Sequence, residues 1–110
     1  MRVLFTREAE TDLSRVVDHY AGQRDGLGNE FVDAVDAMAR EIGKWPMAGR
    51  SFDPSIRGRI LGRFPYWVLY QQRGSIIWVV SLVHQNRGED FWRSRWGIRD
   101  ESAAYVPRAV

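Results

Sequence analysis

Two β-prone runs joined by a tight turn constrain the fold of this chain more than any other feature. The run at 66–72 reads YWVLYQQ, the run at 75–83 reads SIIWVVSLV, and Arg73 and Gly74 separate them. Aromatic and β-branched residues on both sides of a short glycine-containing turn are typical of a β-hairpin. The second run is apolar on both faces, which predicts a strand in the interior of a sheet.

A further strand is predicted just before this hairpin, because residues 56–63 alternate with a period of two. One face would carry Ile56, Gly58, Ile60 and Gly62, and the other would carry Arg57, Arg59, Leu61 and Arg63. Pro65 marks a turn or bulge between this strand and the hairpin, and residues 47–55 are expected to form a loop.

Two amphipathic helices are predicted in the first half of the chain. A short strand at 2–6 leads to Thr6, a plausible N-cap, and apolar residues then recur at helical spacing over 9–20 and 27–42. The sequence GQRDG at 22–26 separates the helices, and Trp45-Pro46 ends the second one. Helices joined by so short a turn should pack antiparallel.

The resulting order is β-α-α-β-β-β, an α+β domain in which a helical hairpin packs on one face of a mostly antiparallel sheet. We expect the arginines on the other face. The domain would span 1–96, including a short helix at 88–96, and residues 97–110 would form a loose C-terminal tail.

The chain has 110 residues and no cysteine, which indicates a single domain without disulfides or thiolate metal sites. It has no apolar run near the ~20 residues that span a bilayer, and its start does not resemble a signal peptide, so we expect a cytoplasmic protein. Residues 1–55 carry 7 basic and 10 acidic residues, whereas residues 56–110 carry 9 basic and 4 acidic residues. Arginine accounts for almost all of the positive charge, and its planar guanidinium suits phosphate or carboxylate. A GC-rich genome would explain the arginine bias but not the asymmetry, so the second half is predicted to meet an acidic partner.

Arg57, Arg59 and Arg63 are the first candidate site residues, since neighbours two places apart on a strand lie roughly 6–7 Å apart. Such a row is either a solvated sheet edge or a docking surface for phosphate or an acidic peptide.

His84 and Arg87 follow the last predicted strand. They could act as a general base beside a cation, which would suit cleavage of RNA through its own 2′-hydroxyl. Alternatively, the imidazole hydrogen-bonds neighbouring backbone and closes the strand end. This second interpretation is favoured, because no carboxylate or second histidine lies at an evident spacing; His19 is expected at the surface.

Aromatic residues are dense on and after the hairpin. They could stack on nucleic-acid bases, but a small core needs large side chains, and Tyr66, Tyr70 and Trp78 are predicted to be core residues. Trp67 faces the opposite way and is the best candidate for exposure. No glycine-rich phosphate loop, metal-ligand cluster or nucleophile elbow is present in the sequence, and we expect no cofactor and no metal.

Taken in order, these segments resemble the RelE/ParE superfamily of bacterial type II toxin–antitoxin toxins. The resemblance rests on F-T-x-x-A-x-x-D-L at 5–13, on Phe31, Ile42 and Pro46, and on GR at 49–50. It continues through IRGRILGRFPYWVLY at 56–70 and IIWVVSLVHQNR at 76–87. The superfamily fold, two helices on an antiparallel sheet, agrees with the order above.

The resemblance implies one of two activities. RelE-like members are ribosome-dependent mRNA endoribonucleases, in which case Arg57, Arg59, His84 and Arg87 would be the catalytic candidates. ParE-like members instead inhibit DNA gyrase. This chain has Trp67 where the ribonucleases commonly carry an arginine, and it shows no evident C-terminal catalytic tyrosine, since Phe91 and Trp92 occupy that region. His84-Gln85 at the strand end is similar to the ParE branch, which is therefore favoured.

The resemblance also implies a cognate antitoxin that binds the toxin and silences it, and a hetero-oligomer of the two. An acidic antitoxin segment would be the natural partner of the arginines. A degenerate toxin kept only for antitoxin binding is a third alternative. The residues expected to contact antitoxin or target are Arg57, Arg59, Arg63, Trp67, Arg87, Phe91 and Trp92.

Overall fold

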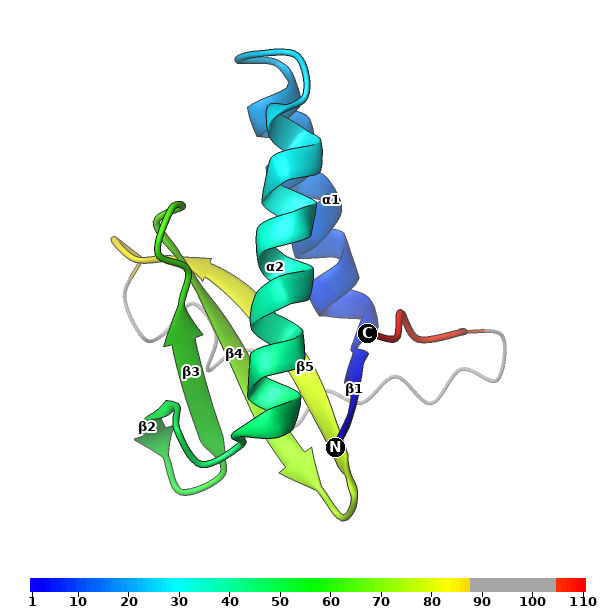
Figure 1. Ribbon diagram of the computed structural model, residues 1–110, viewed down its shortest axis with the longest axis vertical. Coiled ribbons are helices and arrows are strands. Elements are labelled where there is room, and N and C mark those ends of the chain that lie inside the picture. Colours follow the sequence, from blue (N-terminus) through cyan, green and yellow to red (C-terminus); the bar gives the residue numbers. More distant parts are fainter. Residues whose placement is uncertain (88–104) are drawn as a thin grey trace.

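The computed structural model describes residues 1–87 and 105–110, in two layers (Figure 1). The helices α1 (Arg7–Ala21) and α2 (Leu27–Lys44) form one layer. The other layer is a sheet of β1 (Arg2–Phe5), β2 (Arg50–Asp53), β3 (Ile56–Ile60), β4 (Tyr66–Arg73) and β5 (Ile76–His84). This architecture confirms the predicted α+β fold with a helical hairpin on one face of the sheet.

The strands follow the spatial order β1-β5-β4-β3-β2. β1 runs parallel to β5, and the other neighbours are antiparallel, so the sheet is mostly antiparallel as predicted. β5 lies between β1 and β4, which confirms that the run apolar on both faces is an interior strand. β2 was not predicted: residues 50–53 were expected in a loop. RSFD is four residues long and has one apolar residue, a pattern that an edge strand with one partner tolerates.

The helix boundaries follow local chemistry. The Thr6 hydroxyl accepts a hydrogen bond from the Ala9 N–H at 3.2 Å, which confirms the N-cap. α2 begins after Gly26, whose φ of 83° is readily adopted only by glycine, and it ends immediately before Trp45-Pro46. In the described part of the chain, no helix is both long and apolar enough to cross a membrane.

The main core lies between the helices and the sheet. Its fully buried members include Phe5, Phe31, Val35, Ile42, Val68, Tyr70, Ile77 and Val79, with Tyr66 packed against them. The predicted core positions of Tyr66 and Tyr70 are thus confirmed.

The prediction for Trp78 was wrong. Leu69 pairs with Ser81 but Tyr70 pairs with Val79, so Val80 has no partner and forms a β-bulge. The extra residue reverses the alternation of β5, and Trp78 pairs with Gln71 on the face away from the helices.

That second face carries a smaller cluster. Ile56, Leu69 and Val83 are buried there, with Phe52, Trp67 and Val80 packed against them. Trp67 therefore faces away from Tyr66 and Tyr70, as predicted. However, it is half-buried rather than exposed, because its ring packs edge-on against Phe52 with centroids 5.1 Å apart.

The C-terminal segment 105–110 lies along the outer edge of β1. The Phe5 N–H donates to the Arg108 carbonyl at 2.8 Å, and the Val110 N–H donates to the Val3 carbonyl at 3.1 Å. The expectation of a loose tail is therefore wrong for these residues, because β1 offers unpaired backbone groups that they satisfy. The predicted helix at 88–96, the boundary at 96/97, and Phe91 and Trp92 lie outside the described residues.

Candidate functional site

Arg57 and Arg59 lie on the face of the sheet that carries the helices, not on the other face as expected. They pair with Tyr70 and Val68, and residues paired across strands share a face. Both partners belong to the main core. The arginines are accommodated there because β3 lies beside α2 rather than beneath it (Figure 1).

Arg57 is tied to the loop between α2 and β2. Its guanidinium donates to the Gly49 carbonyl at 2.9 Å. It also lines a surface pocket of about 240 Å³ whose other members are Pro46, Met47, Pro54, Ser55, Tyr70 and Gln72. Arg57, one of the predicted docking arginines, therefore also holds the α2–β2 connection against the sheet.

Tyr70 holds the same loop from inside. Its hydroxyl donates to the Pro46 carbonyl at 2.7 Å. Burial raises the pKa of Tyr70, and a hydrogen bond with the Gly49 backbone and the charges of Arg57 and Arg59 oppose that rise. Gly49 passes so close that an added Cβ would lie 2.4 Å from the Tyr70 hydroxyl oxygen. The loop is therefore fixed by close packing as well as by hydrogen bonds.

Two exposed apolar side chains on this loop were not predicted from the sequence. Trp45 is 63% exposed and Met47 is 68% exposed. Met47 and Arg57 line the same pocket, which places an apolar side chain beside the predicted docking arginine. In the sequence, their exposure was indicated only by their position around Pro46, after the last turn of a helix.

Arg63 does not extend the row of arginines. It lies in the β3–β4 connection and pairs with Glu30 of α2 at 2.5 Å, and Arg24 pairs with the same carboxylate at 2.9 Å. Hydrogen bonds from Arg63 first and Arg24 second lower the pKa of Glu30. The predicted three-arginine row is thus a pair, Arg57 and Arg59.

His84 closes the end of β5. Its Nδ1 accepts a hydrogen bond from the Asn86 N–H at 3.1 Å, and its ring packs edge-on to Tyr66 with centroids 5.2 Å apart. The Arg87 N–H donates to the His84 carbonyl at 2.9 Å. These contacts confirm the favoured interpretation, in which the histidine hydrogen-bonds neighbouring backbone.

His84 also lines a second pocket, of about 230 Å³, which we call the His84 pocket. Its lining residues are Arg15, Val16, His19, Tyr66, Leu82, His84 and Arg87. His19 is exposed, as expected, but it brings a second histidine to this place. The sequence spacing could not reveal this, because the two histidines are 65 residues apart and meet only when α1 packs on β5.

Three of the four candidates for ribonuclease chemistry lie at two separate pockets, and the fourth, Arg59, lies on β3 opposite Val68. Arg57 lines the first pocket, whereas His84 and Arg87 line the His84 pocket. Through Tyr70, Arg57 is in register with Val79, five residues before His84 on β5. Five residues of a strand span about 16 Å, so the backbone does not gather Arg57 and His84 at one phosphate.

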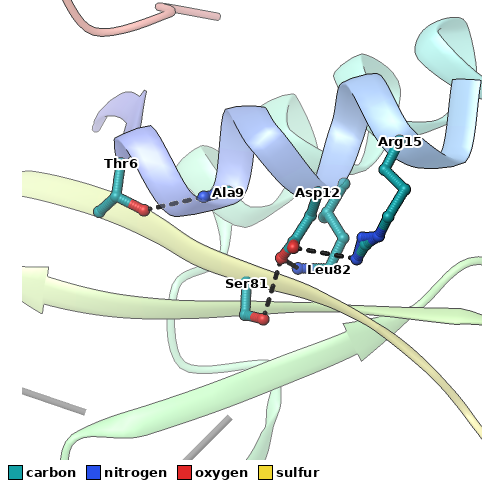
Figure 2. Close-up of polar contacts among 6 residues, drawn as sticks. All are labelled: Thr6, Ala9, Asp12, Arg15, Ser81 and Leu82. Atoms are coloured by element: carbon teal, nitrogen blue, oxygen red, sulfur yellow. Dashed lines mark hydrogen bonds and ion pairs between the residues drawn. The ribbon is translucent and has the colours of Figure 1, made fainter. Parts of the chain in front are cut away.

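The packing of α1 on β5 depends on a buried carboxylate. Figure 2 shows Asp12 bonded to three groups at once: the Leu82 N–H at 3.0 Å, the Ser81 hydroxyl at 3.2 Å and the Arg15 guanidinium at 3.1 Å. Asp12 is fully buried. This network explains the Asp of the F-T-x-x-A-x-x-D-L segment, whose Thr6 caps the same helix, and it positions Arg15 at the His84 pocket.

One curated relative is similar to a short part of the chain. A stretch of 40 residues is 45% identical to the thioesterase TesA of Mycobacterium leprae (strain TN). It covers 36% of this chain but only 15% of the thioesterase. A similarity of that extent transfers no activity.

The comparison with solved structures covers most of the fold. A chain of the chromosomal ParDE TA system from P. aeruginosa is similar with a TM-score of 0.67 and 25% sequence identity. The similarity covers 76% of this chain and 95% of that chain.

The family model described as the ParE toxin of the type II toxin-antitoxin system, parDE, matches residues 3–88. The match runs from β1 to the end of β5 and includes both helices of the described part. It confirms the superfamily resemblance and selects its ParE branch. The chain therefore belongs to the ParE family of type II toxin–antitoxin toxins.

Proposed function

We propose that this toxin acts by binding and inhibiting DNA gyrase, and that a cognate antitoxin silences it. The observation that carries the proposal is the match to the ParE toxin family over residues 3–88.

The geometry of the two pockets favours a binding inhibitor over a nuclease. Ribonuclease chemistry needs a base and positive charge at one phosphate. Arg15 and Arg87 bring positive charge to the pocket of His84, but Arg57 is held by the Gly49 carbonyl at the other pocket. His84 Nδ1 is already occupied by the Asn86 N–H.

We assign antitoxin docking to the β3 surface, which we define as Trp45, Met47, Arg57 and Arg59. Exposed apolar side chains beside arginines are typical of protein–protein contacts, in which aromatic residues, Met and Arg are enriched. The arginines favour an acidic segment and would steer its approach.

A strand of the antitoxin would add at β2. The outer edge of β1 is occupied by residues 108–110, whereas among the described residues no strand pairs with the outer edge of β2. Unpaired edge groups next to complementary charge suit strand addition.

The other expected contact residues remain proposals. Arg63 and Trp67 are placed at the β3–β4 connection and on the second face of the sheet. Arg87 lies at the His84 pocket, and Phe91 and Trp92 fall outside the described residues. We assign these five to contacts with target rather than to the β3 surface.

Controlled expression in a bacterial host tests the proposed target. Gyrase inhibition predicts growth arrest, loss of negative supercoiling in a reporter plasmid, and rescue by the co-expressed antitoxin. His84→Ala should keep all three effects. Intact supercoiling with new mRNA 5′ ends, abolished by His84→Ala, would instead establish a nuclease.

Antitoxin docking is tested separately by co-purification. Met47→Glu places a negative charge on the β3 surface and should weaken capture of an acidic antitoxin by about tenfold or more. Val106→Glu is the matched control, because Val106 is 82% exposed on the C-terminal segment. Equal capture of both variants would contradict the assignment of this surface.

A further inference from the structure

Apart from Arg87, the residues of the His84 pocket have no task in the proposed function, yet the lining is chemically distinctive. Five of its seven residues carry hydrogen-bond donors: Arg15, His19, Tyr66, His84 and Arg87. Among the residues that the structure describes, no acidic side chain lines the pocket. A hollow surrounded by cationic or neutral donors selects for an anion.

The donors come from separate elements and so surround the hollow. Arg15 and His19 lie on α1, Tyr66 begins β4, His84 ends β5, and Arg87 lies in the turn that follows. Ion pairing with Asp12 at 3.1 Å orients Arg15, and only one of its two terminal nitrogens takes part in that contact. Its guanidinium carries further N–H groups.

Each histidine uses one ring nitrogen in a hydrogen bond to a neighbouring group. The Asn86 N–H donates to Nδ1 of His84, which leaves Nε2 outside that contact. The side-chain amide of Gln23 lies 2.9 Å from Nε2 of His19, which leaves Nδ1 outside that contact. Each ring therefore keeps one nitrogen that these contacts do not use.

The size and donor arrangement fit a phosphate group better than a carboxylate. At about 230 Å³ the pocket is smaller than the ~300–1,000 Å³ typical of drug-sized ligands, so it suits one small group. A carboxylate is planar and is satisfied by a single arginine fork. Donors from three elements instead match the oxygens of a tetrahedral anion. We propose that the His84 pocket is a phosphate-binding site.

The two histidines make a direct test possible. The chain contains two histidines, and both line this pocket, so every imidazole signal in an NMR spectrum reports on it. Titration of the purified toxin with inorganic phosphate should give saturable shifts of both ring signals. Neither sodium chloride at the same ionic strength nor sodium acetate should give saturable shifts of the ring signals. No saturable shift, or an equal response to acetate, would overturn the proposal.

A matched pair of variants separates a site from general charge attraction. Arg87→Gln should weaken phosphate binding by about tenfold or more, because a charge-assisted contact is lost. Arg40→Gln removes the same charge from an exposed position on α2, outside the pocket, and should leave binding unchanged. If both substitutions weakened phosphate binding equally, the result would contradict a phosphate site formed by the pocket residues. Circular dichroism checks that both variants are folded.

Two further ligands identify the source of the phosphate. If the site takes the backbone of a nucleic acid, a short single-stranded oligonucleotide should bind more tightly than inorganic phosphate and shift the same two signals. If it takes a free phosphate compound, a mononucleotide should bind as tightly as the oligonucleotide. The measurement uses the toxin alone, so its outcome is independent of gyrase.

Discussion

The carboxylate of Asp12 accepts a hydrogen bond from the backbone N–H of Leu82 at 3.0 Å, which joins α1 to β5 across 70 residues of chain. The contact lies beside the bulge at Val80, where Ser81 also bonds to Asp12. β1 pairs with β5 only as far as Val79, so Leu82 lies beyond that pairing, and here a buried side chain satisfies its N–H.

Asp12→Ala should therefore lower the free energy of unfolding by about 2–4 kcal/mol, because buried donors lose a charged acceptor. Asp12→Asn keeps an acceptor oxygen and should cost less. Chemical denaturation of both variants measures the difference. Asp18→Ala, at an exposed position of the same helix, is the control and should have little effect.

Gly49→Ala should destabilise the protein by about 1–3 kcal/mol through overpacking, since the new Cβ would lie 2.4 Å from the Tyr70 hydroxyl oxygen. Tyr70→Phe removes that oxygen and should cost about 1 kcal/mol by itself. In the Tyr70→Phe background the alanine should be tolerated better. A double-mutant cycle of unfolding free energies measures this coupling, and strict additivity would argue against the close contact.

Glu30 should make stability depend on pH at the acid end. Hydrogen bonds from Arg63 and Arg24 lower its pKa in the folded protein below the ordinary value of 4.5. Its contribution is then fully present above that value and is lost as the pH falls through the lower, folded value. Glu30→Gln should have a slightly lower Tm than the parent protein at pH 7, and the gap should close in acid. A difference in Tm that persists at pH 2 would contradict the ion pair. A difference in Tm at pH 7 that does not change with added salt would also contradict it.

Asp36 should hold the C-terminal segment in place. The Arg108 guanidinium contacts both of its carboxylate oxygens at 2.8 Å, and the Arg108 carbonyl accepts from the Phe5 N–H. Asp36→Ala should speed hydrogen exchange of the Phe5 and Val110 amides by about three- to tenfold. Amides of β4 and β5 should be unaffected. Asp33→Ala, exposed on the same helix, serves as control.

Local periodicity was enough to predict both helices, the hairpin and a strand beginning at Ile56, because each repeats its apolar spacing over several residues. That strand was predicted over 56–63, but it ends at Ile60. Thr6 predicted where α1 begins and Pro46 predicted where α2 ends, because capping and proline geometry act within a few residues.

Trp78 and the C-terminal segment were missed because each depends on contacts distant in sequence. β2 pairs with the neighbouring strand β3 and was missed because RSFD has little apolar character. The face of Trp78 is set by a single unpaired residue, Val80, whose bulge is anchored by Asp12 of another element. β2 is extended because it pairs with β3, and residues 108–110 bond to the outer edge of β1, with an isolated bridge at Ala109.

The candidate site was harder to predict than the fold. A row of Arg57, Arg59 and Arg63 was predicted, but Arg63 pairs with Glu30, and the face of Arg57 and Arg59 follows from register with β4. His19 and His84 line the same pocket only because α1 packs on β5, and their spacing in the sequence does not predict this.

A supercoiling assay with purified DNA gyrase and purified toxin tests whether the toxin inhibits gyrase. We predict that toxin at a stoichiometric ratio stops ATP-dependent supercoiling, that His84→Ala still does so, and that added antitoxin restores activity. Full gyrase activity in the presence of toxin whose fold is verified by circular dichroism would contradict it.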